Sequence, residues 1–240
     1  MPGLSVIVKI KKMKKNQILV LIFTLASTIT FSQSKYNIYS KRNSEKVYFE
    51  DFLTDTHGWA VGTYEACRIY KWVPGYYELK SVCNGTYSES STNNNALFSI
   101  DQDRDFEIET SMMFVSGENN NSNCISWGQS NSRISDRFRF GFSGNGQYII
   151  DKNYNSSWTN LKSWTESSLI NKNAYNKFTI RKIRSQYYFF INESLVHNCP
   201  FEPFYGQRLS FQTNQNSTIR VDYIRISYLK KNKSIGPADF

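Results

Sequence analysis

The stretch that decides the fold is residues 176–229, NKFTIRKIRSQYYFFINESLVHNCPFEPFYGQRLSFQTNQNSTIRVDYIRISYL. Its four apolar runs are separated by polar or glycine-containing turns, and none has the 3.6-residue period of an amphipathic helix. In the last run, Ile219, Val221 and Tyr223 alternate with polar residues, as in a strand with one buried face. The alternation changes phase at Ile224, which predicts a β-bulge near Tyr223 or a strand buried on both faces. This stretch therefore predicts an antiparallel sheet.

The composition of the rest of the chain also favours strands. The 240 residues include 16 Tyr and 17 Phe, and aromatic side chains are enriched in strands. Short apolar runs alternate with turns rich in Asn, Ser and Gly, and the dipeptides Pro74-Gly75 and Asn145-Gly146 predict hairpins. We expect one all-β domain over residues 47–229, and Greek-key or jelly-roll β-sandwiches of two antiparallel sheets are built in this way.

Residues 1–32 have the pattern of a secretory signal peptide. Several lysines precede a short apolar segment at residues 18–26, and small residues follow it, with Met13 as a possible true start. The apolar segment is too short to span a bilayer, which takes about 20 residues. We therefore expect no transmembrane span after the signal is removed, and a secreted, periplasmic or cell-surface location.

The charge of the expected mature chain is close to neutral. Five of the 29 basic residues and none of the 20 acidic ones lie in residues 1–32, which leaves a net charge of +4. The basic runs at residues 181–184 and 230–233 are short, so the sequence indicates no nucleic-acid partner, which would need a clustered basic face. We interpret residues 33–46 as an extended lead-in and residues 230–240 as a C-terminal tail.

Four cysteines follow the leader, and an exported protein can oxidise them. Cys67 and Cys83 flank Pro74-Gly75 almost symmetrically, so we favour a disulfide between them across a hairpin. Cys124 and Cys199 form the second, less favoured pair. The absence of a C-x2-C spacing, with only two histidines in the chain, argues against zinc.

A series of short motifs between residues 47 and 229 resembles the concanavalin A-like lectin/glucanase superfamily, a jelly-roll group that includes laminin G-like modules and family 16 glycoside hydrolases. In chain order they are Phe49-Glu50-Asp51-Phe52, Trp59, Tyr77-Glu78-Leu79, Asp105-Phe106-Glu107-Ile108-Glu109, Trp127-Gly128, Phe190-Ile191-Asn192-Glu193 and Val221-Asp222-Tyr223-Ile224-Arg225-Ile226. The resemblance implies a concanavalin A-like fold and a function connected with sugars.

The resemblance raises the possibility of catalysis. Glycoside hydrolysis needs two carboxylates that flank the scissile bond, and family 16 enzymes carry them at alternate positions of one strand. Asp105, Glu107 and Glu109 have this spacing, so they are the catalytic candidates if the chain is an enzyme. In that family, however, the catalytic strand follows the strand of the middle tryptophan, whereas here it precedes Trp127. The other interpretation is an ordinary strand with a polar face in water.

The resemblance also implies a structural calcium ion. The closing strand of the related enzymes contributes an aspartate to such a site, which matches Asp222, and Glu50 or Asp51 could lie nearby. One carboxylate is weak support, because calcium takes six to eight oxygen ligands. Asp222 could instead pair with Arg220 or Arg225. We interpret the aspartates at 101, 103 and 105 as a turn, since the glycine and distal glutamate of an EF-hand are missing.

Exposed aromatic side chains are the candidates for sugar binding, because their flat faces bury the apolar side of a sugar ring. The candidate ligand-binding residues are Trp127, Arg139, Tyr148, Tyr154, Trp158 and Trp164, with Asn153 and Asn155 as polar partners. Trp127 lies in an apolar run and could be part of the core instead. Trp158 and Trp164 lie among polar residues.

The sequence thus predicts a secreted, non-catalytic carbohydrate-binding or adhesion module with a glycan or polysaccharide partner. The alternative is an exported glycoside hydrolase or related sugar-active enzyme that uses the Asp105–Glu109 carboxylates. A third possibility is a structural module that binds other surface proteins.

Overall fold

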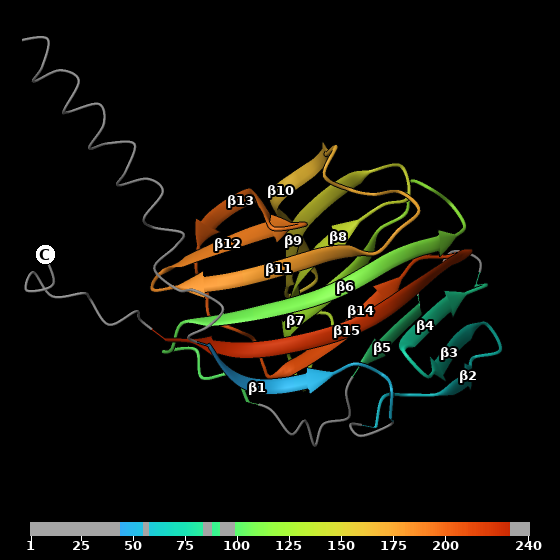
Figure 1. The fold of residues 1–240 in the computed structure, drawn as a ribbon, viewed down its shortest axis with the longest axis horizontal. Helices are drawn as coiled ribbons and strands as arrows, with labels where there is room; N and C mark the ends of the chain where they lie inside the picture. The colour runs from blue at the N-terminus through green and yellow to red at the C-terminus, as the bar shows by residue number, and fades with distance from the viewer. Residues whose placement is uncertain (1–43, 55–57, 84–87, 92–98, 231–240) are drawn as a thin grey trace, which may run out of the picture. The chain divides into compact units, whose positions relative to one another are not determined.

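The computed structural model describes residues 44–54, 58–83, 88–91 and 99–230, which form fifteen strands and no helix. The strands pair antiparallel in two sheets that pack face to face (Figure 1). This confirms the predicted jelly-roll β-sandwich. In the part of the chain that the structure describes, nothing helical has the length and apolar character that a membrane crossing requires.

The larger sheet has nine strands. In order across the sheet they are β13 (Ser194–Pro200), β12 (Gln186–Ile191), β11 (Asn176–Ile183), β6 (Phe106–Ser116), β15 (Ser217–Leu229), β4 (Tyr76–Ser81), β3 (Arg68–Val73) and β2 (Gly62–Tyr64), with β1 (Ser44–Glu50) paired to β15. The quoted stretch supplies four of these strands, β11, β12, β13 and β15, and its fifth strand, β14, belongs to the other sheet.

The smaller sheet has six strands. Their order is β10 (Ser157–Glu166), β9 (Gln147–Tyr154), β8 (Arg137–Phe142), β7 (Asn123–Gln129), β14 (Arg208–Thr213) and β5 (Ser88–Ser91). Consecutive strands β7 to β10 are neighbours, and β14 joins them from the C-terminal part of the chain. Strand β10 is therefore one edge of this sheet.

Strand β15 lies at the centre of the nine-stranded sheet and contains the predicted bulge. Its pairing with β6 shifts register between Val221 and Tyr223, which confirms the bulge. The shift lets Val221 and Ile224 both point into the core, where they are fully buried. At the same point the other edge of β15 changes partner, from β4 to β1. The phase change in the sequence therefore marks the point on β15 where its register with β6 shifts and its other partner changes from β4 to β1.

The core between the sheets is rich in aromatic side chains because inward-facing positions alternate along each strand. Phe138, Phe140 and Phe142 of β8 are all buried, as their spacing predicts. The ring of Phe140 packs edge-on against Phe178 of β11, with centroids 5.2 Å apart, which joins the two sheets. Such edge-to-face contacts stabilise a core beyond the area they bury.

The predicted leader, most of the lead-in and residues 231–240 lie outside the described residues. Strand β1 begins at Ser44, inside the expected lead-in of residues 33–46. The compact unit that contains both sheets runs from Ser44 to Lys230.

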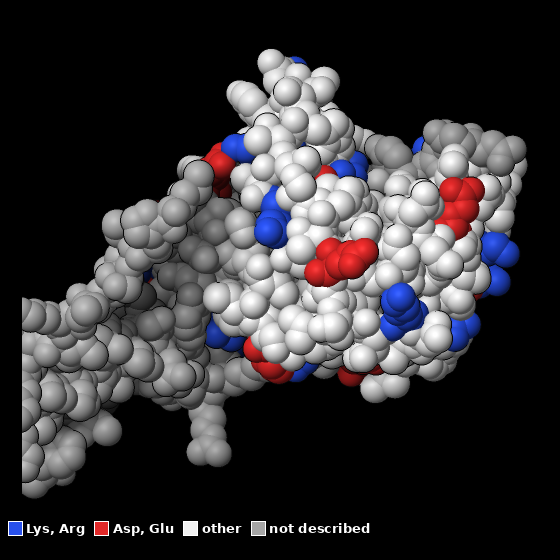
Figure 2. All heavy atoms as spheres, turned by 90° about the horizontal axis from the view of Figure 1, so that it is seen from above, with Lys and Arg blue, Asp and Glu red and all other residues white. Residues whose placement is uncertain are grey.

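Charged residues of this unit are largely paired with each other. Within the basic run at residues 181–184, Arg181 Nε donates to Glu107 Oε2 at 2.7 Å, and Lys182 Nζ donates to the carbonyl of Arg104 at 3.2 Å. On the face seen in Figure 2, basic and acidic residues are scattered among uncharged ones, and neither sign forms an extended patch. The basic run is therefore part of the internal ion pairing of the sheet.

Both predicted hairpin turns are present. Pro74-Gly75 joins β3 to β4, and residues 143–146 join β8 to β9, where the Gly146 amide donates to the Ser143 carbonyl at 3.1 Å. Gly75 and Gly146 both have φ near +94°, in the region that only glycine enters cheaply. The two glycines therefore set the register of their hairpins.

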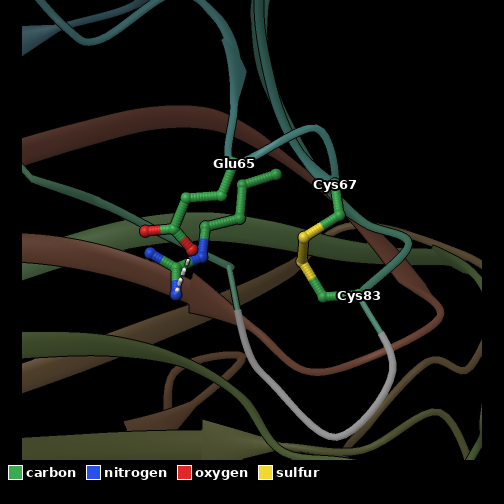
Figure 3. The surroundings of a disulfide bond; sticks show 4 residues. Glu65, Cys67 and Cys83 are labelled. Carbon is green, nitrogen blue, oxygen red and sulfur yellow. Dashed lines mark ion pairs between the residues drawn. A yellow bond between two sulfur atoms is a disulfide. The ribbon is translucent and has the colours of Figure 1, made fainter.

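The favoured disulfide is confirmed. Cys67 and Cys83 are bonded at the open end of the β3–β4 hairpin, with their Cα atoms 4.9 Å apart (Figure 3). The amide of Val82 donates to the Cys67 carbonyl at 2.9 Å, and Glu65 forms an ion pair of 3.2 Å with Arg68 beside the bond. The disulfide thus closes a hairpin whose strands already pair.

The second predicted disulfide is wrong, because neither Cys124 nor Cys199 forms a disulfide bond. Cys124 lies on β7 and faces away from the core, where its Sγ approaches Gln212 Oε1 at 3.6 Å. Cys199 lies on β13 of the other sheet and packs against the core. The six-stranded sheet therefore separates the two sulfur atoms.

Candidate functional site

The outer face of the six-stranded sheet, which is the face turned away from the core, carries a row of polar residues. Register places Asn160, Asp151, Arg139, Ser126 and Ser210 opposite one another on five successive strands, from β10 to β14. Each alternates with an apolar neighbour that points into the core. We call these five residues the polar row. It crosses nearly the whole width of the sheet, but Ser126, Ser210 and Asp151 are buried, and only its β10 end is open to solvent, at the exposed Asn160.

An ion pair lies within the polar row. Arg139 Nε donates to Asp151 Oδ1 at 2.8 Å, and its Nη2 donates to Oδ2 at 2.7 Å. The side chains are 14% and 3% exposed, so the pair is largely removed from water. Burial lowers the pKa of the Arg139 guanidinium, but its hydrogen bonds to Asp151 and its electrostatic interactions with Cys124 and Asp151 together outweigh burial and raise that pKa above its usual value. Arg139 therefore stays charged and fixed in position.

Trp158 packs on this ion pair. The guanidinium carbon of Arg139 lies 3.8 Å from the centroid of the indole ring, which is a close cation–π contact. Trp158 is nevertheless 47% exposed, because it lies on the edge strand β10. One face of the indole is therefore held by a rigid charged group, and the rest of the ring remains accessible to a ligand.

A buried acceptor lies beside Trp158. Asn153 pairs directly with Trp158 across β9 and β10 and is 4% exposed. Its Oδ1 atom accepts no hydrogen bond from the residues that the structure describes. A buried polar atom of this kind normally takes a water molecule or a ligand group. The indole and Asn153 thus combine an apolar plane with a hydrogen-bond acceptor.

Trp164 and Tyr154 are exposed but lie away from the ion pair. Trp164, 40% exposed, lies in the bulge of β10 between Lys162 and Thr165. Tyr154, 58% exposed, stacks on Tyr205 with ring centroids 5.2 Å apart and an interplanar angle of 20°. Tyr154 has the same strand parity as the core residues of β9, so it extends the core outward at the rim. Its ring is not part of the outer face.

Two of the predicted ligand-binding residues belong to the core instead. Trp127 is fully buried, stacks on Phe138 at 5.6 Å, and its Nε1 donates to the hydroxyl of Tyr187 at 3.3 Å. Tyr148 is 4% exposed, and its hydroxyl donates to the carbonyl of Val196 at 3.0 Å. Both residues occupy inward positions of their strands, so the prediction that they contact a ligand is wrong.

The candidate catalytic carboxylates lie on the outer face of the other, nine-stranded sheet, and each is engaged by cations. Glu107 pairs with Arg181 through two nitrogens. Glu109 is 2% exposed and accepts bonds from Tyr223 and Arg225 at 2.8 and 2.5 Å. Asp105 accepts from a backbone amide at 2.5 Å and lies 3.8 Å from Lys182. Their alternate spacing produces a structural row of ion pairs.

The implied calcium site gains no support from the arrangement of its residues. The Oε1 atom of Glu50 accepts the backbone amide of Phe52 at 2.7 Å. Over the described residues, no three His, Cys, Asp or Glu side chains cluster as metal ligands would. The two arginines considered as partners of Asp222 pair with Glu78 and Glu109. Calcium at Asp222 stays a prediction, and no step below depends on it.

The expected turn at residues 101–105 is confirmed. The amide of Asp103 donates to Asp101 Oδ1 at 3.0 Å, and the amide of Arg104 donates to the Asp101 carbonyl at 3.3 Å. The aspartate side chain thus stabilises the turn before β6.

Asp151, the partner of Arg139, was not among the site residues predicted from the sequence. A signal was available, because the two residues are equidistant from Asn145 in the predicted hairpin turn and must therefore lie opposite each other. Ser126 and Ser210 were missed for a different reason. Their pairing depends on strands more than 80 residues apart in the chain, which no local pattern reveals.

No protein-family model matches the sequence, and no curated protein matches it. Solved structures do match by fold. A β-glucanase of Bacillus licheniformis has 10% identity and a TM-score of 0.55, with 77% of this chain and 98% of that one covered. An endo-β-galactosidase of Clostridium perfringens that releases GlcNAcα1-4Gal has 12% identity and a TM-score of 0.57, with coverage of 79% and 64%.

A third match is the CBM2 module of the evolved Dit of Lactobacillus casei BL23 phage J-1, with 10% identity, a TM-score of 0.52, and 79% and 98% covered. At such identities the likeness shows the fold alone. This chain and these three proteins share the jelly-roll β-sandwich fold.

Proposed function

We propose that this chain is an exported, non-catalytic carbohydrate-binding or adhesion module that binds a glycan on the outer face of the six-stranded sheet. The observation that carries the proposal is the half-exposed indole of Trp158 on the buried Arg139–Asp151 pair. A sugar ring has an apolar face and a rim of hydroxyls. The indole matches the first, and the exposed side chain of Asn160 together with the partly exposed guanidinium of Arg139 matches the second.

The fold and the surface charge support this proposal. Solved proteins with the same fold include a β-glucanase and a CBM2 module. The face seen in Figure 2 mixes both signs of charge, which suits a polar ligand of low charge better than a polyanion.

The ion pairing of Glu107 and Glu109 supports a role without catalysis. A catalytic carboxylate must contact the scissile bond, and Glu107 and Glu109 are only 4% and 2% exposed. Both glutamates accept bonds from arginine side chains. The competing function, an exported glycoside hydrolase, would have to break these pairs to use either group.

Export is also part of the proposal. The disulfide between Cys67 and Cys83 is of the kind that persists in oxidising compartments, which agrees with the signal-peptide pattern of residues 1–32. N-terminal sequencing of the protein from the culture medium or the cell envelope tests this part. An N-terminus at or near Gln33 is expected, and a retained leader would contradict it.

The binding proposal is tested with a glycan array followed by titration calorimetry on the best ligand. Trp158→Ala is expected to weaken binding at least tenfold, since one stacked aromatic ring and its supporting contact are lost. Tyr64→Ala is the matched control, because Tyr64 is 44% exposed on β2 of the other sheet. Its affinity should equal that of the unmodified protein.

Two results would overturn the proposal. The first is the absence of any glycan binding, or binding that Trp158→Ala leaves unchanged. The second is turnover of a polysaccharide that Glu107→Gln abolishes, which would establish the hydrolase alternative. A panel of β-glucans, galactans and mucin O-glycans assayed for new reducing ends covers that alternative.

A further inference from the structure

A cavity of about 510 Å³ opens at the far end of β10, where the strand runs into the loop that leads to β11. Its lining includes Asn145 of the β8–β9 turn, Glu166 at the end of β10, Ser167, Ser168 and Lys172. Five polar side chains thus surround a space of the size that small-ligand sites have. The function proposed above does not use this cavity.

Glu166 and Lys172 are the two charged groups that line this cavity. No ion pair or hydrogen bond of either side chain occurs with the residues that the structure describes, whereas most other charged groups of the two sheets are paired. The stem of Lys172 lies close over Gly146, where an added Cβ would come within 3.1 Å of its Cε. The lysine is thus held at the cavity and remains free to bind.

Glu166 lies on the same face of the sheet as Trp158. Glu166 pairs with Gln147 of β9, and Trp158 pairs with Asn153, so both are opposite outward positions of that strand. Thr165 pairs with the inward-facing Tyr148, and Trp164, the residue before it, therefore lies on the outward side. Edge strand β10 presents Trp158, Trp164 and then the cavity, in that order, along one face.

The distances along β10 exclude a single sugar ring as the ligand of both tryptophans. Thr165 of β10 faces residue 148 of β9 and Trp158 faces residue 153, so Trp164, which precedes Thr165, lies about four positions of β9 from Trp158, or about 14 Å at about 3.4 Å per residue. A ligand that contacts both indoles must therefore be an oligosaccharide that runs along the strand. Such a chain would reach the cavity at its end.

We propose that the protein recognises the end of a glycan chain: the cavity takes the terminal sugar residue, and Trp164 and Trp158 stack on the residues that follow it. This inference rests on the proposed function and specifies its ligand. The carboxylate of Glu166 accepts bonds from hydroxyls of the terminal residue, and the ammonium of Lys172 donates to its oxygens. The cavity lies where β10 ends, so a glycan chain bound along the strand has its last residue there.

The experiment tests whether binding depends on the number of chain ends in the polysaccharide. The polysaccharide that binds best on the array is used as a competitor, once intact and once after partial acid hydrolysis, at equal mass. Hydrolysis multiplies ends without changing the sugars, so the hydrolysate is expected to compete better in proportion to its reducing-end content. Competition that is equal or weaker after hydrolysis overturns the proposal.

Variants separate this proposal from the general one. Glu166→Gln and Lys172→Met are each expected to weaken binding about tenfold and to remove the preference for the hydrolysate. Glu65→Gln is the control, because Glu65 is an exposed glutamate near β2 of the other sheet. If Trp158→Ala weakens binding but both cavity variants bind normally, the general function holds and chain-end recognition is wrong. If no glycan binds, the general glycan-binding function and chain-end recognition are both wrong.

Discussion

Removal of Asp151 is expected to destabilise the protein by several times more than removal of an exposed acid. Asp151→Ala leaves the guanidinium of Arg139 without its partner in a site where the two side chains are only 14% and 3% exposed. Loss of one member of a buried ion pair costs about 3–5 kcal/mol. Since Arg139 reaches some water, we expect the lower end, about 3 kcal/mol.

The control is Glu65→Ala, which removes the same charge from a pair that is open to water. Glu65 lies 3.2 Å from Arg68, with side-chain exposures of 66% and 29%. Exposed pairs of this kind contribute about 0–1 kcal/mol. Urea unfolding, monitored by tryptophan fluorescence, gives the free energies of unfolding of both variants by the same linear extrapolation. In a unit of this size, 3 kcal/mol corresponds to a fall in Tm of about 6–12 °C.

A double variant tests whether the cost arises from the unpaired charge. Arg139→Met together with Asp151→Leu replaces the pair by apolar groups, which is often neutral in stability. The double variant should therefore be more stable than Asp151→Ala alone. If instead Asp151→Ala unfolds at the same urea concentration as Glu65→Ala, then Arg139 is solvated, and the account of how Trp158 is held in place is wrong.

Three further variants or measurements follow from other contacts. Replacement of Cys67 and Cys83 by alanine should lower the free energy of unfolding by about 3 kcal/mol, given their separation of 16 residues; a urea midpoint insensitive to reductant in the unmodified protein would contradict this. Burial raises the pKa of the Cys199 thiol from 9.0 to about 11, so alkylation at pH 8 should run about 100-fold slower in the native than in the unfolded protein; equal rates would refute the burial. The stability that this neutral thiol contributes is present below pH 9 and is lost as the pH rises through about 11. Tyr223→Phe removes a 2.8 Å bond to Glu109 and should cost about 1.5 kcal/mol; a loss under 0.5 kcal/mol in urea unfolding would show that the bond is not formed in solution.

Local pattern was sufficient for the parts of the fold that depend on neighbours in the chain. The alternation in β8, the glycine turns and the phase change at Tyr223 each have one physical solution, because side chains alternate along a strand and positive φ favours glycine. The same logic would have paired Arg139 with Asp151. The polar neighbours of Trp158 in the sequence predicted an exposed side chain, and in the structure this residue is 47% exposed.

Contacts between distant segments could not be predicted in this way. The spacing of Glu107 and Glu109 correctly placed them on one face of β6, but it gave no information about which residues cover that face. Their partners Arg181 and Arg225 are 74 and 116 residues away in the chain. A row of carboxylates has the same spacing whether it acts on a substrate or pairs with arginines. Only the register of β6 with β11 and β15 distinguishes the two.

The two bulges of β10 protect the edge of the six-stranded sheet from pairing with a second chain, and they orient Trp164 for the proposed glycan binding. An edge strand presents unpaired backbone groups, and regular edges invite pairing with a second chain. The pairing of β10 with β9 shifts register twice, between Asn160 and Lys162 and between Lys162 and Thr165. Bulges of this kind make an edge irregular and redirect side chains. They thus discourage edge pairing, and they also turn Trp164 to the same face as Trp158.

A variant with one bulge residue deleted, such as Ser163, should move Trp164 out of that alignment and favour association of the chain. Weakened glycan binding together with dimers in size-exclusion chromatography would support this double role, whereas a monomer with unchanged affinity would refute it.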